Sequence, residues 1–405
     1  MAGTSIEWTR GEDGRPGKAW NPTTGCDKVS PGCGLPRFAG DATGGCYAMA
    51  MAWRLKAMSQ AKYQADGDPR SSGPGFGLTV HPDVLTLPLH WRTPSRVFVD
   101  SMSDLGHARA GRGFLARVWA TMAATPQHTY QILSKRPERM RRVLSSAEFQ
   151  DQMQAALGQL AEDRQARHGR GAIQQAPPWP LPNVWLGTSI ELDCYTRRAG
   201  ELRATPAAVR MLSLEPLLGP LPSLDLAGID WALIGGESGP AARPMDLGWA
   251  RDLIALAQQT GTTVFVKQLG SRWAREHGGR GKASNWDDWP ADLRIREFPD
   301  ARGRQRMLRI PARRAGVRST RPGTPPVKDP RCQLLTADTR GHLAERQDPS
   351  CKTTSASGTA RPAAPRRRPG PGARLSSPAP STGRCAPAGR AASARPPARP
   401  AGRSS

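Results

Sequence analysis

The stretch Val209-Arg210-Met211-Leu212-Ser213-Leu214-Glu215 is a short apolar run that ends in polar residues. The same pattern returns in Trp231-Ala232-Leu233-Ile234-Gly235-Gly236-Glu237. Further runs of this kind occupy residues 96–101, 128–135, 183–189 and 263–268. Helical patterns separate the runs, as at residues 111–124, and strands joined through helices form right-handed βαβ units with both faces covered. The sequence therefore predicts an α/β fold, a partial parallel (β/α) barrel that is TIM-barrel-like.

Six successive strand ends in this pattern carry Ser, Lys, Glu, Asp or Gln. In a parallel barrel the chemistry lies at these carboxyl ends, where the loops converge. We expect catalytic roles for Asp104, Lys135 and Glu215, although Glu215 could also serve only to cap its loop. Glycines at the end of the 231–237 run leave room for a cofactor's ribose or phosphate near the backbone, or make a tight turn. Gly235, Gly236 and Glu237 are therefore expected to contact a cofactor, and Ser101, Ser189 and Glu191 are further candidate site residues at the strand ends.

Three clustered cysteines, Cys26, Cys33 and Cys46, follow an expected first strand at residues 4–9. Three thiolates can bind three irons of a 4Fe-4S cluster and leave the fourth iron open to a substrate or cofactor. A structural zinc site would need a fourth ligand from His81, His90 or His107. Unligated buried thiols are the third interpretation. We expect the cluster.

The composition of the 405-residue chain changes near residue 310. Residues 311–405 contain no Phe, Trp or Tyr and carry 19 Lys and Arg against 4 Asp and Glu. Such a segment buries too little apolar surface to offset its conformational entropy. We expect a barrel domain at residues 1–310 and a disordered basic tail at residues 311–405.

The net charge of +24 is compatible with nucleic acid as a partner, through the basic surface and the tail. No apolar run approaches the roughly 18 residues that a membrane span requires. Residues 1–16 are too polar and acidic for a signal peptide. We expect a cytoplasmic protein with no membrane contact.

Six motifs between about residues 4 and 275 carry a family resemblance. They are Trp20-Asn21-Pro22 with Gly25-Cys26, Ser30, Gly32-Cys33 and Cys46-Tyr47-Ala48; Phe98-Val99-Asp100-Ser101-Met102-Ser103-Asp104-Leu105; Ser134-Lys135-Arg136-Pro137-Glu138-Arg139-Met140; Leu212-Ser213-Leu214-Glu215-Pro216-Leu217-Leu218-Gly219-Pro220; Gly235-Gly236-Glu237-Ser238-Gly239; and Lys267-Gln268. Together they resemble the phage-associated three-cysteine family, labelled phage gene product thirty-seven / gene product sixty-eight, a domain of unknown function.

The order of these motifs is more distantly similar to radical S-adenosylmethionine enzymes of the spore photoproduct lyase type. That resemblance implies that the three cysteines hold the cluster and that S-adenosyl-L-methionine occupies the open iron. It also implies that Ser101, Asp104, Lys135, Ser189 and Glu191 contact the cofactor or substrate. Reduction would cleave the sulfonium to a 5′-deoxyadenosyl radical, with the protein supplying orientation and a dry cavity.

The spacing of the cysteines departs from the compact run of radical enzymes. The second gap holds an insertion of about ten residues between Gly34 and Gly45, whose Gly and Pro content suggests a surface excursion that returns Cys46 to its place. The sequence thus predicts a radical-type iron–sulfur enzyme of phage or mobile-element origin. The alternative is a non-catalytic accessory protein in which a structural metal stabilises the fold and the surface binds nucleic acid or a protein partner encoded nearby.

Overall fold

The computed structural model describes residues 3–4, 6–11, 13–35, 44–168 and 177–299. The predicted tail at residues 311–405 lies outside these ranges. Within them, no helix is long and apolar enough to cross a membrane.

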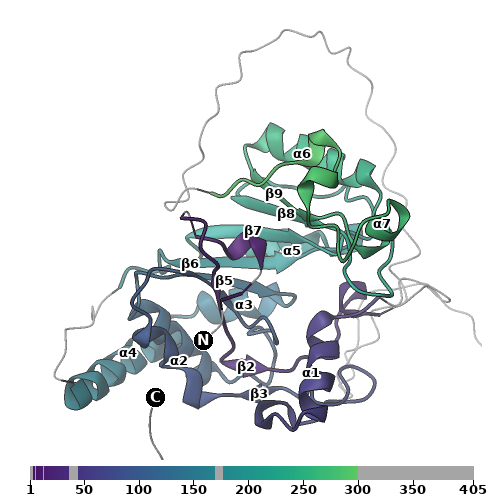
Figure 1. Cartoon of the computed structure of the whole chain (residues 1–405). Helices are drawn as coiled ribbons and strands as arrows, with labels where there is room; N and C mark the ends of the chain where they lie inside the picture. The colour runs from purple at the N-terminus through teal and green to yellow at the C-terminus, as the bar shows by residue number, and fades with distance from the viewer. Residues whose placement is uncertain (1–2, 5, 12, 36–43, 169–176, 300–405) are drawn as a thin grey trace, which may run out of the picture. The chain divides into compact units, whose positions relative to one another are not determined.

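Seven strands form one parallel sheet in the order β1-β4-β5-β6-β7-β8-β9 (Figure 1). Two further short strands, β2 and β3, form a separate antiparallel pair. The strands are β1 Lys18–Trp20, β2 Thr23–Thr24, β3 Thr79–Val80, β4 Arg96–Val99, β5 Thr129–Ser134, β6 Val184–Ser189, β7 Val209–Leu214, β8 Trp231–Gly235 and β9 Thr263–Gln268. The helices are α1 Tyr47–Ala57, α2 Arg112–Ala123, α3 Pro137–Leu144, α4 Ala147–His168, α5 Arg197–Arg203, α6 Leu247–Thr260 and α7 Ser271–Glu276. This seven-strand half-barrel confirms the predicted fold class.

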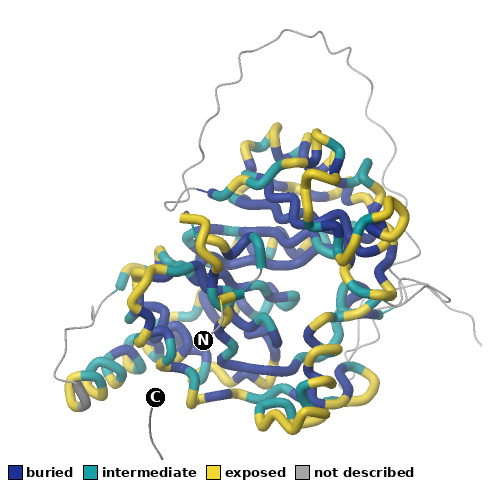
Figure 2. Tube along the Cα trace, viewed as in Figure 1, coloured by how far each residue is buried: buried dark blue, intermediate teal, exposed yellow. Residues whose placement is uncertain are grey.

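The two faces of the sheet bury different apolar clusters. Alternate side chains of a strand point to opposite faces, so Leu186 of β6 packs in the large cluster with the helices, whereas its neighbour Trp185 packs in the smaller one with Trp231 and Phe265. Figure 2 shows the strands as the buried layer of the fold. Because both faces are covered, the strands read as near-continuous apolar runs in the sequence.

Residues 4–9 do not form the expected first strand. Glu7–Thr9 is a 3-10 turn instead, and the first strand of the sheet is β1. Trp8 is 1% exposed and packs edge-on against Phe98 and Trp231, with ring centroids 4.8 and 6.2 Å apart. A large aromatic ring gains more by filling the inner face of the half-barrel than by pairing at a sheet edge, so this segment contributes a side chain to the core and no strand to the sheet.

Candidate functional site: a three-cysteine loop over the half-barrel

The cysteine loop lies between the first strands and α1. Cys26 follows β2, Cys33 ends a 3-10 turn, and Cys46 directly precedes α1. Gly34 has a left-handed φ of 87°, and a Cβ atom there would lie 2.8 Å from the carbonyl oxygen of Gly44. The two ends of the predicted insertion therefore touch, so the chain that leaves after Cys33 returns beside it before Cys46.

The three thiols share one electrostatic environment. Burial and, to a smaller extent, the nearby carboxylate of Asp104 raise the pKa of Cys26 to about 12. The positive charge of Arg136 acts in the opposite direction and offsets part of this increase in the pKa. Burial also raises the pKa of Cys46, and Cys33 adds to the increase at both other thiols. Buried thiols of this kind keep their protons until a metal displaces them.

The described histidines do not complete the alternative Cys3His zinc site. In the described ranges, no three Cys, His, Asp or Glu side chains are arranged to hold one metal ion. His107 Nε2 lies 2.7 Å from Asp27 Oδ2, His81 Nε2 lies 2.8 Å from Thr24 Oγ1, and His90 is exposed. The absence of such a metal-holding group among the described residues includes the three cysteines, so the 4Fe-4S cluster remains a prediction from the residue types alone.

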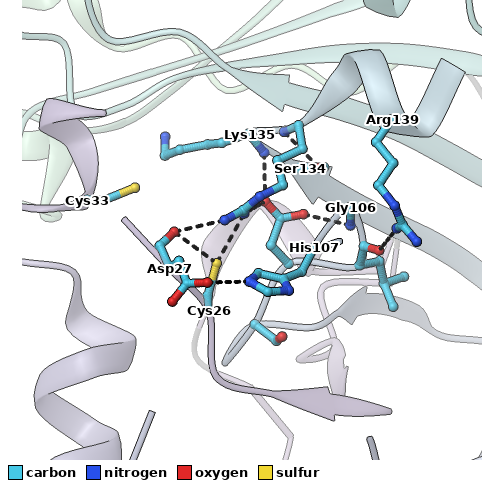
Figure 3. A network of polar contacts seen from close by, with 12 residues as sticks. Cys26, Asp27, Cys33, Gly106, His107, Ser134, Lys135 and Arg139 are labelled. Carbon is cyan, nitrogen blue, oxygen red and sulfur yellow. Dashed lines mark hydrogen bonds and ion pairs between the residues drawn. The ribbon is translucent and has the colours of Figure 1, made fainter. Parts of the chain in front are cut away.

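Cys26 is held by an ion pair that joins the ends of β4 and β5. Arg136 Nη1 lies 2.8 Å from Asp104 Oδ2 and donates to Cys26 Sγ at 3.2 Å, while Nη2 donates to the carbonyl oxygen of Asp27 at 3.0 Å. Burial acts to raise the pKa of Asp104, but Arg136 and hydrogen bonds from nearby donors outweigh it, so the pKa is lowered. Figure 3 shows this network, with the sulfur of Cys33 turned toward the side on which Cys26 and Lys135 lie.

Glu191, after β6, holds the segment around Cys33. The carboxylate has no solvent exposure and accepts a hydrogen bond from the backbone N–H of Gly32 at 3.2 Å. Lys135 Nζ lies 3.6 Å away and Arg198 Nη1 donates at 3.1 Å. Burial acts to raise the pKa of Glu191, but Lys135, Arg198 and a hydrogen bond from Ser30 outweigh it and lower the pKa. The carboxylate therefore stays charged and fixes the loop.

Glu237, after β8, holds both sides of the insertion. Arg243 donates from Nη2 to Oε1 at 2.7 Å and from Nε to Oε2 at 2.8 Å, and its Nη2 also donates to the carbonyl oxygen of Pro31 at 2.8 Å. A weaker bond of 3.4 Å reaches the carbonyl oxygen of Leu35. A Cβ atom on Gly44 would lie 1.9 Å from Glu237 Oε1. Glu237 thus fixes the stems that bring Cys33 and Cys46 together.

β6 and β8 each end on a small residue that a glutamate follows two positions later, and in β7 the small residue is the last but one of the strand, with the glutamate directly after the strand. The pairs are Ser189 and Glu191, Ser213 and Glu215, and Gly235 and Glu237. Side chains two positions apart along a strand share a face, so a small residue leaves space below its glutamate. Ser213, Glu215 and Glu237 line a cavity at this position.

This cavity has a volume of about 350 Å³ and lies at the carboxyl ends of the strands. Its apolar floor is Trp8, Phe98 and Leu133, and Lys135 and Lys267 bring positive charge to its wall. The lining residues are Ile6, Glu7, Trp8, Gly32, Gly45, Cys46, Tyr47, Phe98, Leu133, Lys135, Ser213, Glu215, Pro216, Glu237, Ser238, Lys267 and Lys282. The cysteine loop therefore borders a space that could hold a small ligand, within the usual size range of such sites.

The structure divides the predicted site residues into two groups. Those that line the cavity are Cys46, Lys135, Glu215 and Glu237. Those outside its lining are Cys26, Cys33, Ser101, Asp104, Ser189, Glu191, Gly235 and Gly236. Ser101 Oγ donates to Asn21 Oδ1 at 3.1 Å, and a Cβ atom on Gly236 would lie 2.3 Å from the carbonyl oxygen of Leu269. Close packing of the segment after β8 on the segment after β9 thus explains why residue 236 is a glycine. The expected contacts with a cofactor remain predictions.

Sequence reasoning assigned no role to four basic residues that organise the site. They are Arg136, Arg198, Arg243 and Lys267, and Lys267 pairs with Glu215, which also accepts from Gln268. Lys267 carried a signal, because a charged residue on the buried strand β9 needs a partner. Arg198 and Arg243 lie beyond the strand ends, where a charged residue is ordinary, and nothing in the sequence distinguished them.

The fold and site define a class of protein: a partial parallel barrel whose mouth is covered by a loop with three thiols. The family model described as "Protein of unknown function (DUF5131)" matches residues 3–318, so the chain belongs to this family, which is the phage Gp37/Gp68 family. The predicted family resemblance is confirmed at this level. Comparisons with curated proteins and with solved structures found no match.

Proposed function

We propose that this protein is an iron–sulfur enzyme of the radical S-adenosylmethionine type. One observation carries the proposal: Cys46 lies on the wall of the 350 Å³ cavity, and the close approach of Gly34 and Gly44 returns the chain that leaves after Cys33 to the segment before Cys46. An open iron on three thiolates would then be next to a space of ligand size at the mouth of a parallel barrel, where such folds place their chemistry.

The cavity suits chemistry that must exclude water. When bound, the cluster and S-adenosyl-L-methionine would supply reductive cleavage of the sulfonium. The chain itself supplies an apolar floor from Trp8, Phe98 and Leu133. On the wall, Glu215 and Lys267 pair with each other, so their two charges balance within the cavity. Lys135 offers a fixed positive charge, because Glu191 holds its ammonium group at 3.6 Å.

The test is anaerobic reconstitution with iron and sulfide. We expect about four irons and four sulfides per chain, broad visible absorbance that bleaches on reduction, and slow cleavage of S-adenosyl-L-methionine to 5′-deoxyadenosine and methionine. Cys26→Ala, Cys33→Ala and Cys46→Ala should each lose both cluster and cleavage while staying folded by circular dichroism. A fully loaded cluster that neither binds nor cleaves S-adenosyl-L-methionine would contradict the radical mechanism.

A second candidate is a non-catalytic phage accessory protein that binds nucleic acid around a structural metal. The net charge of +24 favours it, since binding through phosphates is electrostatic. Stoichiometric zinc with no iron uptake, together with salt-dependent binding of a mixed-sequence DNA or RNA, would support this candidate over the enzyme.

A further inference from the structure

Arg136 is built into the cysteine loop with a geometry that leaves it little freedom. Its Nη1 bonds both Asp104 Oδ2 and Cys26 Sγ, and its Nη2 bonds the carbonyl oxygen of Asp27. The side chain is 17% exposed and the Asp104 side chain is 8% exposed. A planar guanidinium with three such acceptors is pre-organised, so its bond to the sulfur costs little further ordering.

The three thiols are not equivalent in their donors. Cys26 faces the charged Arg136, whereas Cys33 Sγ has the neutral Ser30 Oγ at 3.9 Å. At Cys46 the backbone N–H groups of α1 act on the thiol, with Lys135 a smaller influence. Charge-assisted hydrogen bonds are about twice as strong as neutral ones. Among the described donors, the strongest one, Arg136, therefore acts on Cys26.

We propose, on the basis of the proposed cluster, that Arg136 is a positioning residue that holds the Cys26 thiolate and raises the reduction potential of the cluster. Reduction adds one electron and makes the cluster more negative, so a fixed positive charge and a hydrogen bond to a ligating sulfur stabilise the reduced form. Asp104 opposes this effect, because its carboxylate pairs with the same guanidinium and acts on Cys26 with the opposite sign. The negative charge of Asp104 thus cancels part of the increase in reduction potential that Arg136 causes.

The two members of the pair therefore give shifts of opposite sign. Arg136→Gln removes the positive charge and should lower the reduction equilibrium constant at least tenfold, which is about 59 mV for one electron. Asp104→Asn removes the negative charge, keeps an oxygen that can accept from Arg136, and should raise the potential. Arg136→Lys keeps the charge but loses the planar fork, so its potential should lie between those of the wild type and Arg136→Gln.

The experiment is a redox titration of the anaerobically reconstituted full chain, followed by electron paramagnetic resonance. Arg139→Gln is the matched control, since Arg139 donates to the backbone carbonyl oxygens of Leu105 and Ala110. Figure 3 shows Arg139 away from Cys26 and Asp27. The potential of Arg139→Gln should fall much less than that of Arg136→Gln, because the hydrogen bonds of Arg139 go to backbone oxygens and not to Cys26. Shifts of opposite sign in Arg136→Gln and Asp104→Asn support the inference, because mere loosening of the loop would not reverse sign between them.

The outcomes separate this inference from the function it rests on. If the wild-type chain takes up no iron, the proposed function fails and the role of Arg136 fails with it. If the wild type loads its cluster but Arg136→Gln and Asp104→Asn keep its potential, or move it in the same direction, only the inference about Arg136 is overturned. If Arg136→Gln does not fold, the sign of the shift in Asp104→Asn decides the question.

Discussion

Replacing Glu237 by Gln should destabilise the protein through the cysteine loop. The Glu237 and Arg243 side chains are 4% and 1% exposed, and two hydrogen bonds of 2.7 and 2.8 Å join them. The backbone N–H of Arg243 donates a third hydrogen bond to Glu237 at 2.9 Å. The new side chain would be neutral and would turn an amide N–H₂ or a single oxygen toward the guanidinium. Removing one partner of a buried pair leaves an uncompensated charge and costs about 3–5 kcal/mol, so we expect Glu237→Gln to lower the free energy of unfolding by this amount.

The measurement is urea unfolding of the wild type, Glu237→Gln and a surface control. Glu276→Gln is the control, because Glu276 pairs with Arg272 on α7 with both side chains about half exposed. Such a pair contributes about 1 kcal/mol or less. Because Arg243 also bonds the carbonyl oxygen of Pro31, Glu237→Gln should load less iron as well. Equal losses of stability in Glu237→Gln and Glu276→Gln would refute the claim that the buried ion pair of Glu237 and Arg243 stabilises the cysteine loop.

Three further predictions concern Asp100 directly after β4, the cysteine loop and the floor of the cavity. Burial raises the pKa of Asp100 to about 8. Between about pH 4 and 8 the folded state therefore keeps a proton that the unfolded state has lost. The free energy of unfolding should then fall by roughly 1 kcal/mol for each pH unit of increase. Asp100→Asn should remove that slope in urea titrations at pH 5–8, and an unchanged slope would contradict it. Gly44→Ala should speed alkylation of Cys33 by iodoacetamide, whereas Gly45→Ala should not, because a Cβ at Gly45 meets nothing within 4 Å. Trp8→Ala should cost about 3–5 kcal/mol in urea unfolding, and a loss below about 1 kcal/mol would show that Trp8 does not fill the half-barrel.

The sheet could be predicted from the sequence because its strands are short apolar runs that each end in polar residues. Strands that are buried on both faces lose the alternation of apolar and polar residues that marks an exposed sheet face. A short apolar run that ends in polar residues therefore indicates such a buried strand. The expected strand at residues 4–9 was wrong, because an apolar residue can be buried without belonging to a strand. A Trp near the chain start reads as part of a strand, although Trp8 fills the inner face without pairing.

The roles within the site could be predicted only in part, because they depend on contacts between distant segments. Arg243 reaches Pro31 across 212 positions, and Glu191 reaches Gly32 across 159. No local pattern records such contacts. The three clustered cysteines, in contrast, lie within residues 26–46, and their residue type limits what they can do.

The strand-end glutamates show why polarity at a barrel mouth does not by itself identify catalytic residues. Glu191 and Glu237 contact the cysteine loop and are each neutralised by a buried arginine, and Glu237 also lines the cavity. Glu215 lines the cavity too, but it pairs with Lys267. A loop that must hold three thiols in place, with few apolar side chains of its own, needs fixed polar anchors, and the strand ends are the rigid elements nearest to it. Anchoring and catalysis therefore draw on the same residue types at the same edge of the sheet. What separates them is burial: a carboxylate with almost no exposure and an arginine partner positions the loop, and one paired with lysine on the cavity wall can meet a ligand.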